Sequence, residues 1–394
     1  MPLLLICIAV LMIALSLLAG QRHKKKDVKL FLTDKFYAVP GIECSIYFNN
    51  VITVINYKNY AFEVLCDMGR TDASRWRAVP EEKDVGEHQL TLRVYDEEGL
   101  VAEGKTTVYV VSPVTEKKSL SLLLMGASQT GAKGYPERIY ELMKKEENVT
   151  FSMIGTNSGD YVPPVPGGVA HEGYGGWGWH SFFTRWSLEE STDNDGLHPA
   201  RPWMRNSPFL FPHGSAFEFD LKQYLDKYNA GALPDVLVAM LGINNIFTAK
   251  SNAEIDRVWK TDIYPYMKRL VAEFRKLNPD IRIAFATLTP GAFSQDAFGE
   301  SYQCAYTLWQ WRKNLACYHL HKLPAAVEEL KVDLIPVHAV VDGDNAYPEK
   351  EEPAHLHSEK NLFRQSNGVH PAPAGYKQIG DCMFAYLKNL LNSK

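Results

Sequence analysis

Hydrophobic and polar positions follow one pattern from residue 28 to residue 113 and a different one from residue 119 onward. In the first part, short runs such as HQLTLRVYD alternate apolar and polar side chains, and turn residues separate the runs. A period of two gives a strand one buried face and one solvated face, and no helical period of useful length occurs here. Residues 28–113 are therefore predicted to form a small all-β, immunoglobulin-like sandwich of antiparallel strands.

The second part, residues 119–394, alternates compact apolar runs with helical stretches, after a short polar linker at residues 114–118. The apolar runs, which we interpret as buried parallel strands, are SLSLLLMG, VTFSMIG, DVLVAMLG, IRIAFATL and VDLIPVHAVV. The helical candidates between them span residues 135–145, 253–277, 306–329 and 374–391. This alternation predicts an α/β domain with a doubly wound parallel sheet, in which chemistry is expected at the carboxyl ends of the strands.

The first twenty residues form an unbroken apolar run, MPLLLICIAVLMIALSLLAG, which predicts a signal peptide or an N-terminal membrane anchor. We expect export to the periplasm, the cell surface or the medium. The basic cluster at residues 22–26 follows the apolar run instead of preceding it, which argues against export. Cleavage and retention of the segment stay open, and membrane attachment is expected only through residues 1–20.

Composition narrows the possible partners. Of the 394 residues, 46% are hydrophobic, which is enough for two buried cores, and the formal net charge of -4 arises without long charged blocks. No broad basic face is expected, so nucleic acid is a poor candidate partner.

The cysteines show no C-x-x-C pair and no cysteine–histidine spacing for zinc, so neither a metal site nor a cofactor is predicted. Cys44 and Cys66 either pair in an exported domain or remain free thiols.

Candidate chemistry follows the predicted strands and precedes the last helix. Ser128 follows the first strand of the second domain, and Asn244 follows the third. Between them lies the glycine-rich segment HEGYGGWGW, and His370 stands before Pro371 at the start of the last helical stretch. Taken singly, each has a structural explanation: a helix cap for the serine, an Asx turn for the asparagine, a loop for the glycines and packing for the histidine. Chance does not readily place all of them in this order at strand ends.

In this order, the segments GASQTG, HEGYGGWGW, LGINN and GVHPAPAGY resemble the characteristic blocks of the SGNH, or GDSL-type, hydrolase superfamily. The resemblance covers residues 119–392 and implies a flavodoxin-like sheet and a serine carboxylic ester hydrolase that needs no cofactor. It implies Ser128 as the nucleophile and His370 as the general base. It also implies an oxyanion hole formed by the backbone N–H groups of Ser128 and Gly176 and the side-chain amide of Asn244.

Three positions depart from the family's pattern, and each lacks an acid. The family has aspartate where this chain has Ala127, Asn245 and Asn367. The last position matters most, because the aspartate three residues before the histidine accepts a hydrogen bond from the imidazole. Loss of the corresponding carboxylate in a serine protease costs about four orders of magnitude in rate.

Three explanations for Asn367 compete. In the first, Asn367 is itself catalytic and presents its carbonyl oxygen to the imidazole. In the second, another acceptor takes over, either a backbone carbonyl or a carboxylate of Asp342 or Asp344. In the third, the site is inactive. We prefer a combination of the first two, since the nucleophile, the base and both oxyanion residues are all kept.

Aromatic and guanidinium side chains are dense between the second and third predicted strands of the α/β domain. They are Trp177, Trp179, Trp186, Trp203, Arg185, Arg201 and Arg205. Flat rings stack on sugars and forked donors bind carboxylates, so Trp177, Trp179 and Arg201 are candidate substrate-binding residues. Packing of an irregular insertion is the simpler role for any one tryptophan.

With the resemblance and the expected export, these residues predict a carbohydrate O-acyl esterase, in particular a deacetylase. Its partner would be an acylated poly- or oligosaccharide. One alternative is an O-acyltransferase on the same fold. The other is a catalytically weak glycan-binding protein.

Overall fold

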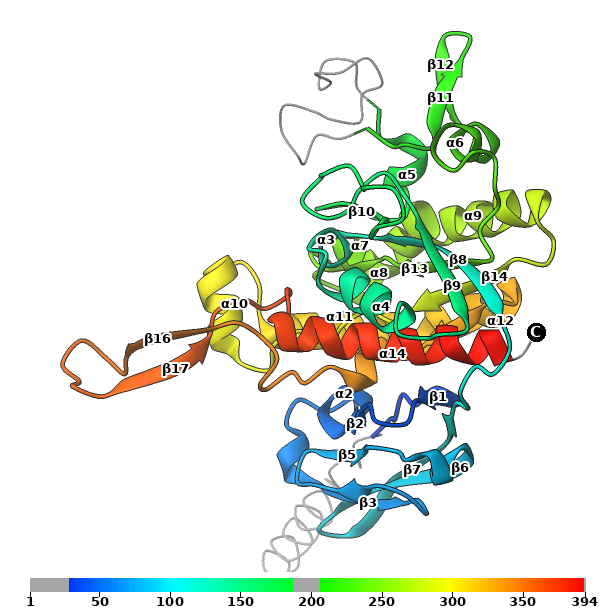
Figure 1. Ribbon diagram of the computed structural model, residues 1–394. Helices are drawn as coiled ribbons and strands as arrows, with labels where there is room; N and C mark the ends of the chain where they lie inside the picture. The colour runs from blue at the N-terminus through cyan, green and yellow to red at the C-terminus, as the bar shows by residue number, and fades with distance from the viewer. Residues whose placement is uncertain (1–27, 187–205, 393–394) are drawn as a thin grey trace, which may run out of the picture.

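Two regions make up the computed structural model, which describes residues 28–186 and 206–392 (Figure 1). The N-terminal region, blue to cyan, consists mainly of strands and lies against helix α14 (Pro373–Asn392) of the larger α/β region. A hairpin of β16 (Glu349–Pro353) and β17 (Asn361–Gln365) projects from the α/β region. The predicted leader at residues 1–20 lies outside the described residues.

The N-terminal region folds into two sheets with the orders β1-β7-β6-β3 and β2-β5-β4. The strands are β1 (Lys35–Ala38), β2 (Cys44–Tyr47), β3 (Ala61–Leu65), β4 (Arg70–Thr71), β5 (Arg75–Ala78), β6 (Gly86–Asp96) and β7 (Gly99–Val110). Short helices connect some of them: α2 (Phe48–Val51), η1 (Tyr57–Asn59) and η2 (Glu82–Asp84). Buried side chains such as Phe36, Trp76 and Leu92 belong to its core.

Strand direction in this region differs from the prediction in one place. β1 runs parallel to β7, whereas the other strand pairs of the region are antiparallel. A tight hairpin forces neighbouring strands to be antiparallel, but most of the region separates β1 from β7 in sequence, so no turn constrains their direction. The immunoglobulin-like topology stays a prediction. Cys44 and Cys66 are free thiols.

The α/β region is built on a parallel sheet. Its strands are β8 (Lys118–Gly126), β9 (Val149–Ile154), β10 (Glu172–Gly173), β13 (Val236–Met240), β14 (Arg282–Ala286) and β15 (Asp333–Ile335). The order is β9-β8-β13-β14-β15, and the short β10 also pairs with β8. This is the order of a doubly wound sheet with its switch point between β8 and β13. A small hairpin of β11 (Leu210–His213) and β12 (Ala216–Phe219) is separate from the sheet.

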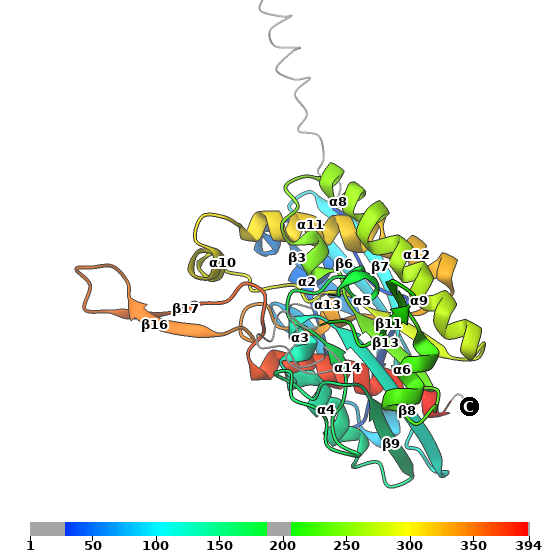
Figure 2. The same cartoon turned by 90° about the horizontal axis from the view of Figure 1, so that it is seen from above.

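Helices cover both faces of the parallel sheet (Figure 2). α4 (Gly134–Met143) and α14 pack together on one face, and α9 (Tyr264–Leu277), α11 (Leu308–His321) and α12 (Leu323–Leu330) lie on the other. The remaining helices are α3 (Ser128–Gly131), α5 (Ser181–Thr184), α6 (Leu221–Tyr228), α7 (Ile243–Ile246), α8 (Asn252–Val258), η5 (Trp259–Ile263), α10 (Gln295–Tyr302) and α13 (Val337–Val340). Residues 122–125 of β8 are fully buried, as expected for a strand covered on both sides.

Prolines shorten two of the predicted elements. The run VDLIPVHAVV predicts one strand, but β15 ends before Pro336 and helix α13 follows it. Pro324 stands at the start of α12, so the helix predicted at residues 306–329 is divided into α11 and α12. The helix predicted at residues 253–277 is continuous, because α8, η5 and α9 follow one another without a gap from Asn252 to Leu277. Proline lacks the backbone N–H that a strand ladder and a helix interior both need.

The two regions are joined between Val110, where β7 ends, and Lys118, where β8 begins. The Asn50 side chain of the N-terminal region donates to the Val341 carbonyl at 2.8 Å, just after α13.

Within the described residues, no helix is long and apolar enough to cross a membrane. The same part of the chain holds no group of His, Cys, Asp or Glu side chains placed to bind a metal ion.

Candidate active site

Backbone register brings three of the predicted site residues to one edge of the sheet. Gly126, the last residue of β8, pairs with β10 on one side and with Met240 of β13 on the other. Parallel strands in register end at the same level. Ser128, Gly176 and Asn244 therefore all follow the sheet at the same edge, within a few residues of a strand end.

The Ser128 hydroxyl and the His370 imidazole meet at this edge. Ser128 Oγ lies 2.8 Å from His370 Nε2, although 242 residues separate the two in sequence. Burial lowers the pKa of His370 below its ordinary value, so the ring is neutral at pH 7 and Nε2 can accept the hydroxyl proton. Both residues keep part of their surface exposed, which leaves the pair accessible to a ligand.

Gln129 fixes the segment that carries the histidine. Its buried side-chain amide donates to Thr289 Oγ1 and to the Val369 carbonyl, both at 2.8 Å. The residue after the nucleophile thus holds the backbone just before His370, which sets the distance between hydroxyl and imidazole. The sequence analysis missed Gln129. Its one signal is its place next to Ser128, because a polar residue in a buried strand-to-helix turn needs hydrogen-bond partners.

The glycine-rich loop leaves the Gly176 N–H, and not that of Gly175, for a ligand. The Gly175 N–H donates to the Tyr161 hydroxyl at 2.9 Å. Gly176 is exposed, and its φ of 77° lies in the left-handed region that favours glycine. Of the two glycines, the structure therefore presents Gly176 as the candidate oxyanion donor.

Asn244 lies in the short helix α7, after a sharp turn at Gly242. The turn needs glycine, because φ is 123° there and an added Cβ would lie 3.0 Å from the Tyr318 hydroxyl oxygen. Asn244 Nδ2 donates to the Trp177 carbonyl at 2.8 Å. A side-chain amide has two N–H groups, so this bond orients the exposed Asn244 and leaves the second N–H for a ligand.

Asn367 contacts the backbone beside the imidazole, which differs from the role expected of it. Its Oδ1 accepts hydrogen bonds from the backbone N–H groups of Val369, at 3.0 Å, and His370, at 2.9 Å. This oxygen therefore shapes the turn that presents the histidine, and its observed hydrogen bonds are to the backbone and not to the ring. Asn and Asp side chains often bind backbone N–H groups two or three residues ahead, and this local geometry competes with bonding to the imidazole.

The carboxylates expected as substitutes act elsewhere. Asp342 Oδ1 accepts the backbone N–H groups of Asp344 and Asn345 at 2.9 and 3.1 Å. Burial raises the pKa of Asp344, which interacts electrostatically with Asp342, Lys58 and Arg312. Burial is the cause that lowers the pKa of His370, and no carboxylate in the described part of the chain contributes to the shift.

Asn245, the second position that lacks an acid, braces the glycine-rich loop. Its Oδ1 accepts the backbone N–H of Trp179 at 3.2 Å. A Cβ at Gly178 would lie only 2.5 Å from the same oxygen, so the loop fits closely over this side chain. An amide oxygen serves here as the acceptor that a carboxylate would otherwise provide.

The tryptophans predicted to bind substrate are buried. Trp177 and Trp179 are 0% and 2% exposed. The Trp177 ring packs against Tyr174 and Phe182, and Trp179 meets Phe285 edge to face at 5.1 Å. The expectation of sugar stacking is therefore wrong for both residues, because their hydrophobic area is used in the core. Arg201 lies outside the described residues.

Glu172 supports the glycine-rich loop from below and was not singled out from the sequence. Its carboxylate is fully buried and accepts hydrogen bonds from Thr156, from the Tyr174 hydroxyl and, at 2.6 Å, from the Tyr224 hydroxyl. Burial, followed by the charge of Glu172, raises the pKa of Tyr224 well above its ordinary value. A buried carboxylate with several donors fixes its surroundings, here the stretch that leads to Gly176.

No protein-family model and no curated protein sequence matches this chain. Solved structures that match include a GDSL-like lipase from Parabacteroides merdae, at 12% identity over 71% of this chain and 99% of that one, with a TM-score of 0.34. A carbohydrate acetylesterase family member from Sinorhizobium meliloti matches at 11% identity over 69% and 99%, with a TM-score of 0.39. An acetylxylan esterase from Geobacillus stearothermophilus, a catalytic mutant, matches at 14% identity over 68% and 94%, with a TM-score of 0.32. With TM-scores below 0.5, these neighbours do not assign a function to this chain.

Proposed function

We propose that this protein is a serine esterase of the SGNH type that removes O-acetyl groups from a carbohydrate. The observation that carries the proposal is the 2.8 Å hydrogen bond between Ser128 Oγ and His370 Nε2 at the carboxyl edge of a doubly wound sheet. A hydroxyl becomes an effective nucleophile when a neutral imidazole is placed to take its proton. The donors at Gly176 and Asn244 follow the same edge, where negative charge would develop on an ester carbonyl oxygen.

The reaction would proceed in two steps. Ser128 Oγ attacks the ester carbonyl carbon while its proton passes to His370 Nε2, and the carbonyl oxygen takes the negative charge. The N–H groups of Ser128 and Gly176 and the free N–H of Asn244 bind that oxygen. The tetrahedral intermediate collapses as the bond to the sugar oxygen breaks, His370 protonates the departing sugar alkoxide, and the acetyl group remains on Ser128 as an ester. Water, deprotonated by His370, then attacks the acetyl carbon, the bond to Ser128 Oγ breaks, and His370 returns the proton to Oγ as acetate leaves.

The missing carboxylate sets a limit on the rate. Among the described residues, no charged group shifts the pKa of His370, so none stabilises the imidazolium that forms in each step, and burial opposes its formation. The turn made by Asn367 supplies orientation but no charge. This observation favours, as a second candidate, a glycan-binding protein with weak catalytic activity.

Turnover of p-nitrophenyl acetate and release of acetate from acetylated xylo-oligosaccharides test the proposal. We expect both substrates to be cleaved and the Ser128→Ala variant to lose about a thousandfold or more in kcat/KM. Mass spectrometry of the protein stopped during turnover should find one acetyl group on Ser128. An O-acyltransferase would release p-nitrophenol slowly unless a sugar acceptor is added, and would then transfer the acetyl group to the sugar instead of releasing it as acetate. Glycan binding that Ser128→Ala leaves intact, with no turnover, would support the second candidate and refute the esterase.

A further inference from the structure

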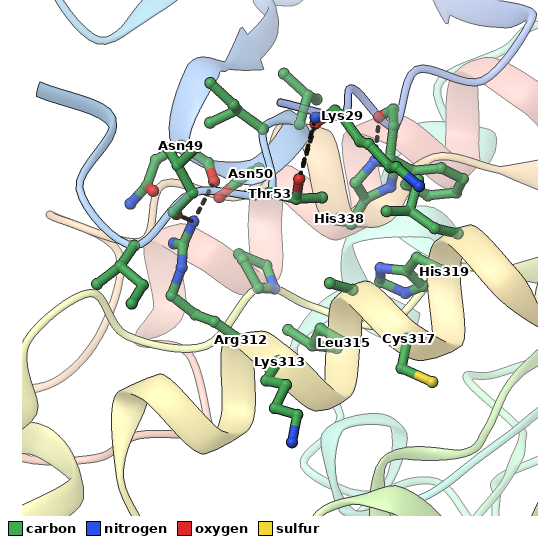
Figure 3. Close-up of a pocket in the computed structure, with 18 of the residues that line it drawn as sticks. Lys29, Asn49, Asn50, Thr53, Arg312, Lys313, Leu315, Cys317, His319 and His338 are labelled. Carbon is green, nitrogen blue, oxygen red and sulfur yellow. Dashed lines mark hydrogen bonds between the residues drawn. The ribbon is translucent and has the colours of Figure 1, made fainter. Parts of the chain in front are cut away.

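A cavity of about 470 Å³ lies between the N-terminal region and helix α11. One wall is formed by residues 49–55 with Lys29 and Phe31, and the other by α11 from Trp309 to His321. Figure 3 shows Asn49, Asn50 and Thr53 on the first wall facing the side chains of the helix. None of Ser128, Gly176, Asn244 and His370 lines this cavity, so it is separate from the candidate active site.

The cavity has an apolar stretch that is open at its rim. Val54, Leu315 and Leu320 line it, and Ile55 and Trp309, which are 68% and 51% exposed, also belong to its lining. Large side chains with this much exposed surface are uncommon inside a junction between two packed regions. An apolar ligand body placed here would remove that surface from water.

The charged groups of the lining are all cationic. Lys29, Arg312 and Lys313 line the cavity, and none of its described lining residues is Asp or Glu. A cavity of 300 to roughly 1,000 Å³ with apolar walls and a few converging polar groups is typical of small-molecule sites. The sign of the charge selects an anion.

Arg312 gives the strongest electrostatic reason to expect an anionic ligand. Its Nη2 donates to the carbonyls of Asn49 and Val54 at 3.0 and 2.9 Å, and its guanidinium lies 5.4 Å from the Phe293 ring centroid. Burial lowers the pKa of Arg312 to about 10, and the more distant Asp344 opposes this shift without forming an ion pair among the described residues. A poorly hydrated cation held by carbonyls alone is stabilised by an anionic ligand, and its remaining N–H groups suit a carboxylate or phosphate.

His319 adds a neutral donor on the same wall. Its Nε2 accepts the backbone N–H of Leu288 at 3.1 Å, so Nδ1 must carry the ring proton. Burial, and then the neighbouring His338, lowers the pKa of His319 well below its ordinary value, so the ring stays neutral. The lining therefore has the Arg312 guanidinium beside residues 49–54 and a neutral N–H donor further along α11, whereas the Lys313 ammonium lies over the Trp309 ring, 5.3 Å from its centroid.

We propose that this cavity binds a small amphiphilic anion, with a carboxylate or phosphate-monoester head held by Arg312 and attracted by the charge of Lys313, the next residue of α11, and an apolar body lying along Val54, Leu315 and Ile55. Because its two walls belong to different regions of the chain, the ligand bridges them and stabilises their contact. The hydrogen bonds from Arg312 of α11 to the carbonyls of Asn49 and Val54 already connect the two regions at this place.

Isothermal titration of the full chain with four probes tests the proposal. The probes are octanoate, octyl phosphate, octanol and acetate, which separate the carboxylate head, the phosphate head, the body without charge and the head without body. We expect at least one of the two charged amphiphiles to bind with one-to-one stoichiometry, about tenfold or more tighter than octanol and acetate. Comparison of octanoate with octyl phosphate distinguishes the two possible head groups.

Variants locate the binding in the cavity. Ala316→Trp should fill the space and remove binding, and Lys313→Gln should weaken the charged probes by about fivefold or more while leaving octanol unchanged. Lys276→Gln, an exposed cation on α9 that does not line the cavity, is the matched control and should bind as the parent does. All three variants should keep the parent's turnover of p-nitrophenyl acetate, which separates this test from that of the esterase.

Three results would overturn the proposal. One is the absence of binding by both charged probes at about 1 mM. Another is octanol binding as tightly as octanoate and octyl phosphate. The third is parent-like affinity in Lys313→Gln for both charged probes, which decides the question even if Ala316→Trp fails to fold.

Discussion

Histidines in two places of this molecule have opposite surroundings. At the carboxyl edge of the sheet, His370 Nε2 bonds a serine hydroxyl at 2.8 Å and the ring keeps contact with solvent. At the junction of the two regions, both nitrogens of His338 are occupied, Nδ1 by Thr287 at 2.9 Å and Nε2 by the Phe31 carbonyl at 3.1 Å. The first ring has a partner that can react, and the second has only partners that hold it.

The difference teaches that the partners of the ring nitrogens, more than burial, separate a reactive histidine from a structural one. Burial lowers the pKa of both His370 and His338, the latter to about 4. The shifts have the same direction, so pKa direction alone would not distinguish them. A carbonyl acceptor on Nε2 fixes the His338 tautomer permanently, whereas a hydroxyl on Nε2 of His370 can lose its proton to the ring.

The largest expected effect is the difference in activity between a variant of His370 and a variant of His338. His370→Ala should lower kcat/KM for p-nitrophenyl acetate by about a thousandfold, because Ser128 loses its proton acceptor. His338→Gln should leave kcat/KM within about twofold, because its partners only hold the junction. Equal losses in the two variants, with circular dichroism showing both folded, would break the comparison.

Asn244 is the next largest test, since it asks whether the sheet edge stabilises an oxyanion. Asn244→Ala should lower kcat by about a hundredfold with little change in KM, because the amide donor acts mainly in the transition state. Asn244→Asp keeps the shape but replaces the donor by a negative charge, so we expect it to lose at least as much. Activity close to the parent in Asn244→Asp would show that the side chain has only a packing role.

His338, at the junction of the two regions, should affect the free energy of unfolding and not the activity. The unfolded chain binds a proton at His338 as pH falls through 6.5, whereas the folded chain resists protonation down to a pKa of about 4. The stabilising contribution is therefore present above pH 6.5 and is lost as pH falls toward 4, by about 2 to 3 kcal/mol. His319 and His338 face each other at 5.2 Å between ring centroids, and His319 contributes in the same direction.

Urea unfolding at pH 7.5 and pH 4.5 measures this effect. The parent should lose more stability between the two pH values than His338→Gln does, because glutamine does not titrate. The comparison uses the difference between pH values, so a general loss of stability in the variant does not disturb it. Identical pH dependence in the two proteins would contradict the assignment.

The smallest expected effect tests why the sheet edge lacks an acid. Asn367→Asp should keep the two backbone N–H bonds and add a negative charge near the imidazole. A negative charge favours the imidazolium, so the pKa of His370 should rise. The pH at which kcat/KM reaches half its plateau should move upward by about 1 unit. Asn367→Ala, which removes the acceptor without adding charge, is the matched control and should lower activity without raising this midpoint.

Much of the fold could be predicted, because the pattern of side chains within a short segment indicates whether it forms a strand or a helix. The buried run of β8 and the alternation in β6 follow from side-chain period alone, and every predicted parallel strand occurs in the sheet. The errors came from prolines, as at Pro336 and Pro324, whose local effect on hydrogen bonding was outweighed in the prediction by the apolar pattern around them. The parallel pairing of β1 with β7 could not be seen, since it depends on contacts between distant residues.

Some features of the candidate site could likewise be predicted from the sequence, and others could not. Ser128, Gly176, Asn244 and His370 were predicted as site residues from local segments and their order, and the structure places Ser128 beside His370. The burial of Trp177 and Trp179 and the role of Gln129 were not found, because burial and partner choice depend on which elements pack together. The same holds for Asn367, whose oxygen turned out to bind backbone N–H groups.

The sequence by itself determined the parallel strands, the helices between them and the chemical types available at the strand ends. These follow from side-chain period and turn chemistry, which act over a few residues. Only the tertiary structure decided which groups each imidazole bonds and that a cation-lined cavity lies between the two regions. The physical reason is that a hydrogen bond or a cavity wall needs atoms from segments hundreds of residues apart, and packing alone fixes where those atoms meet.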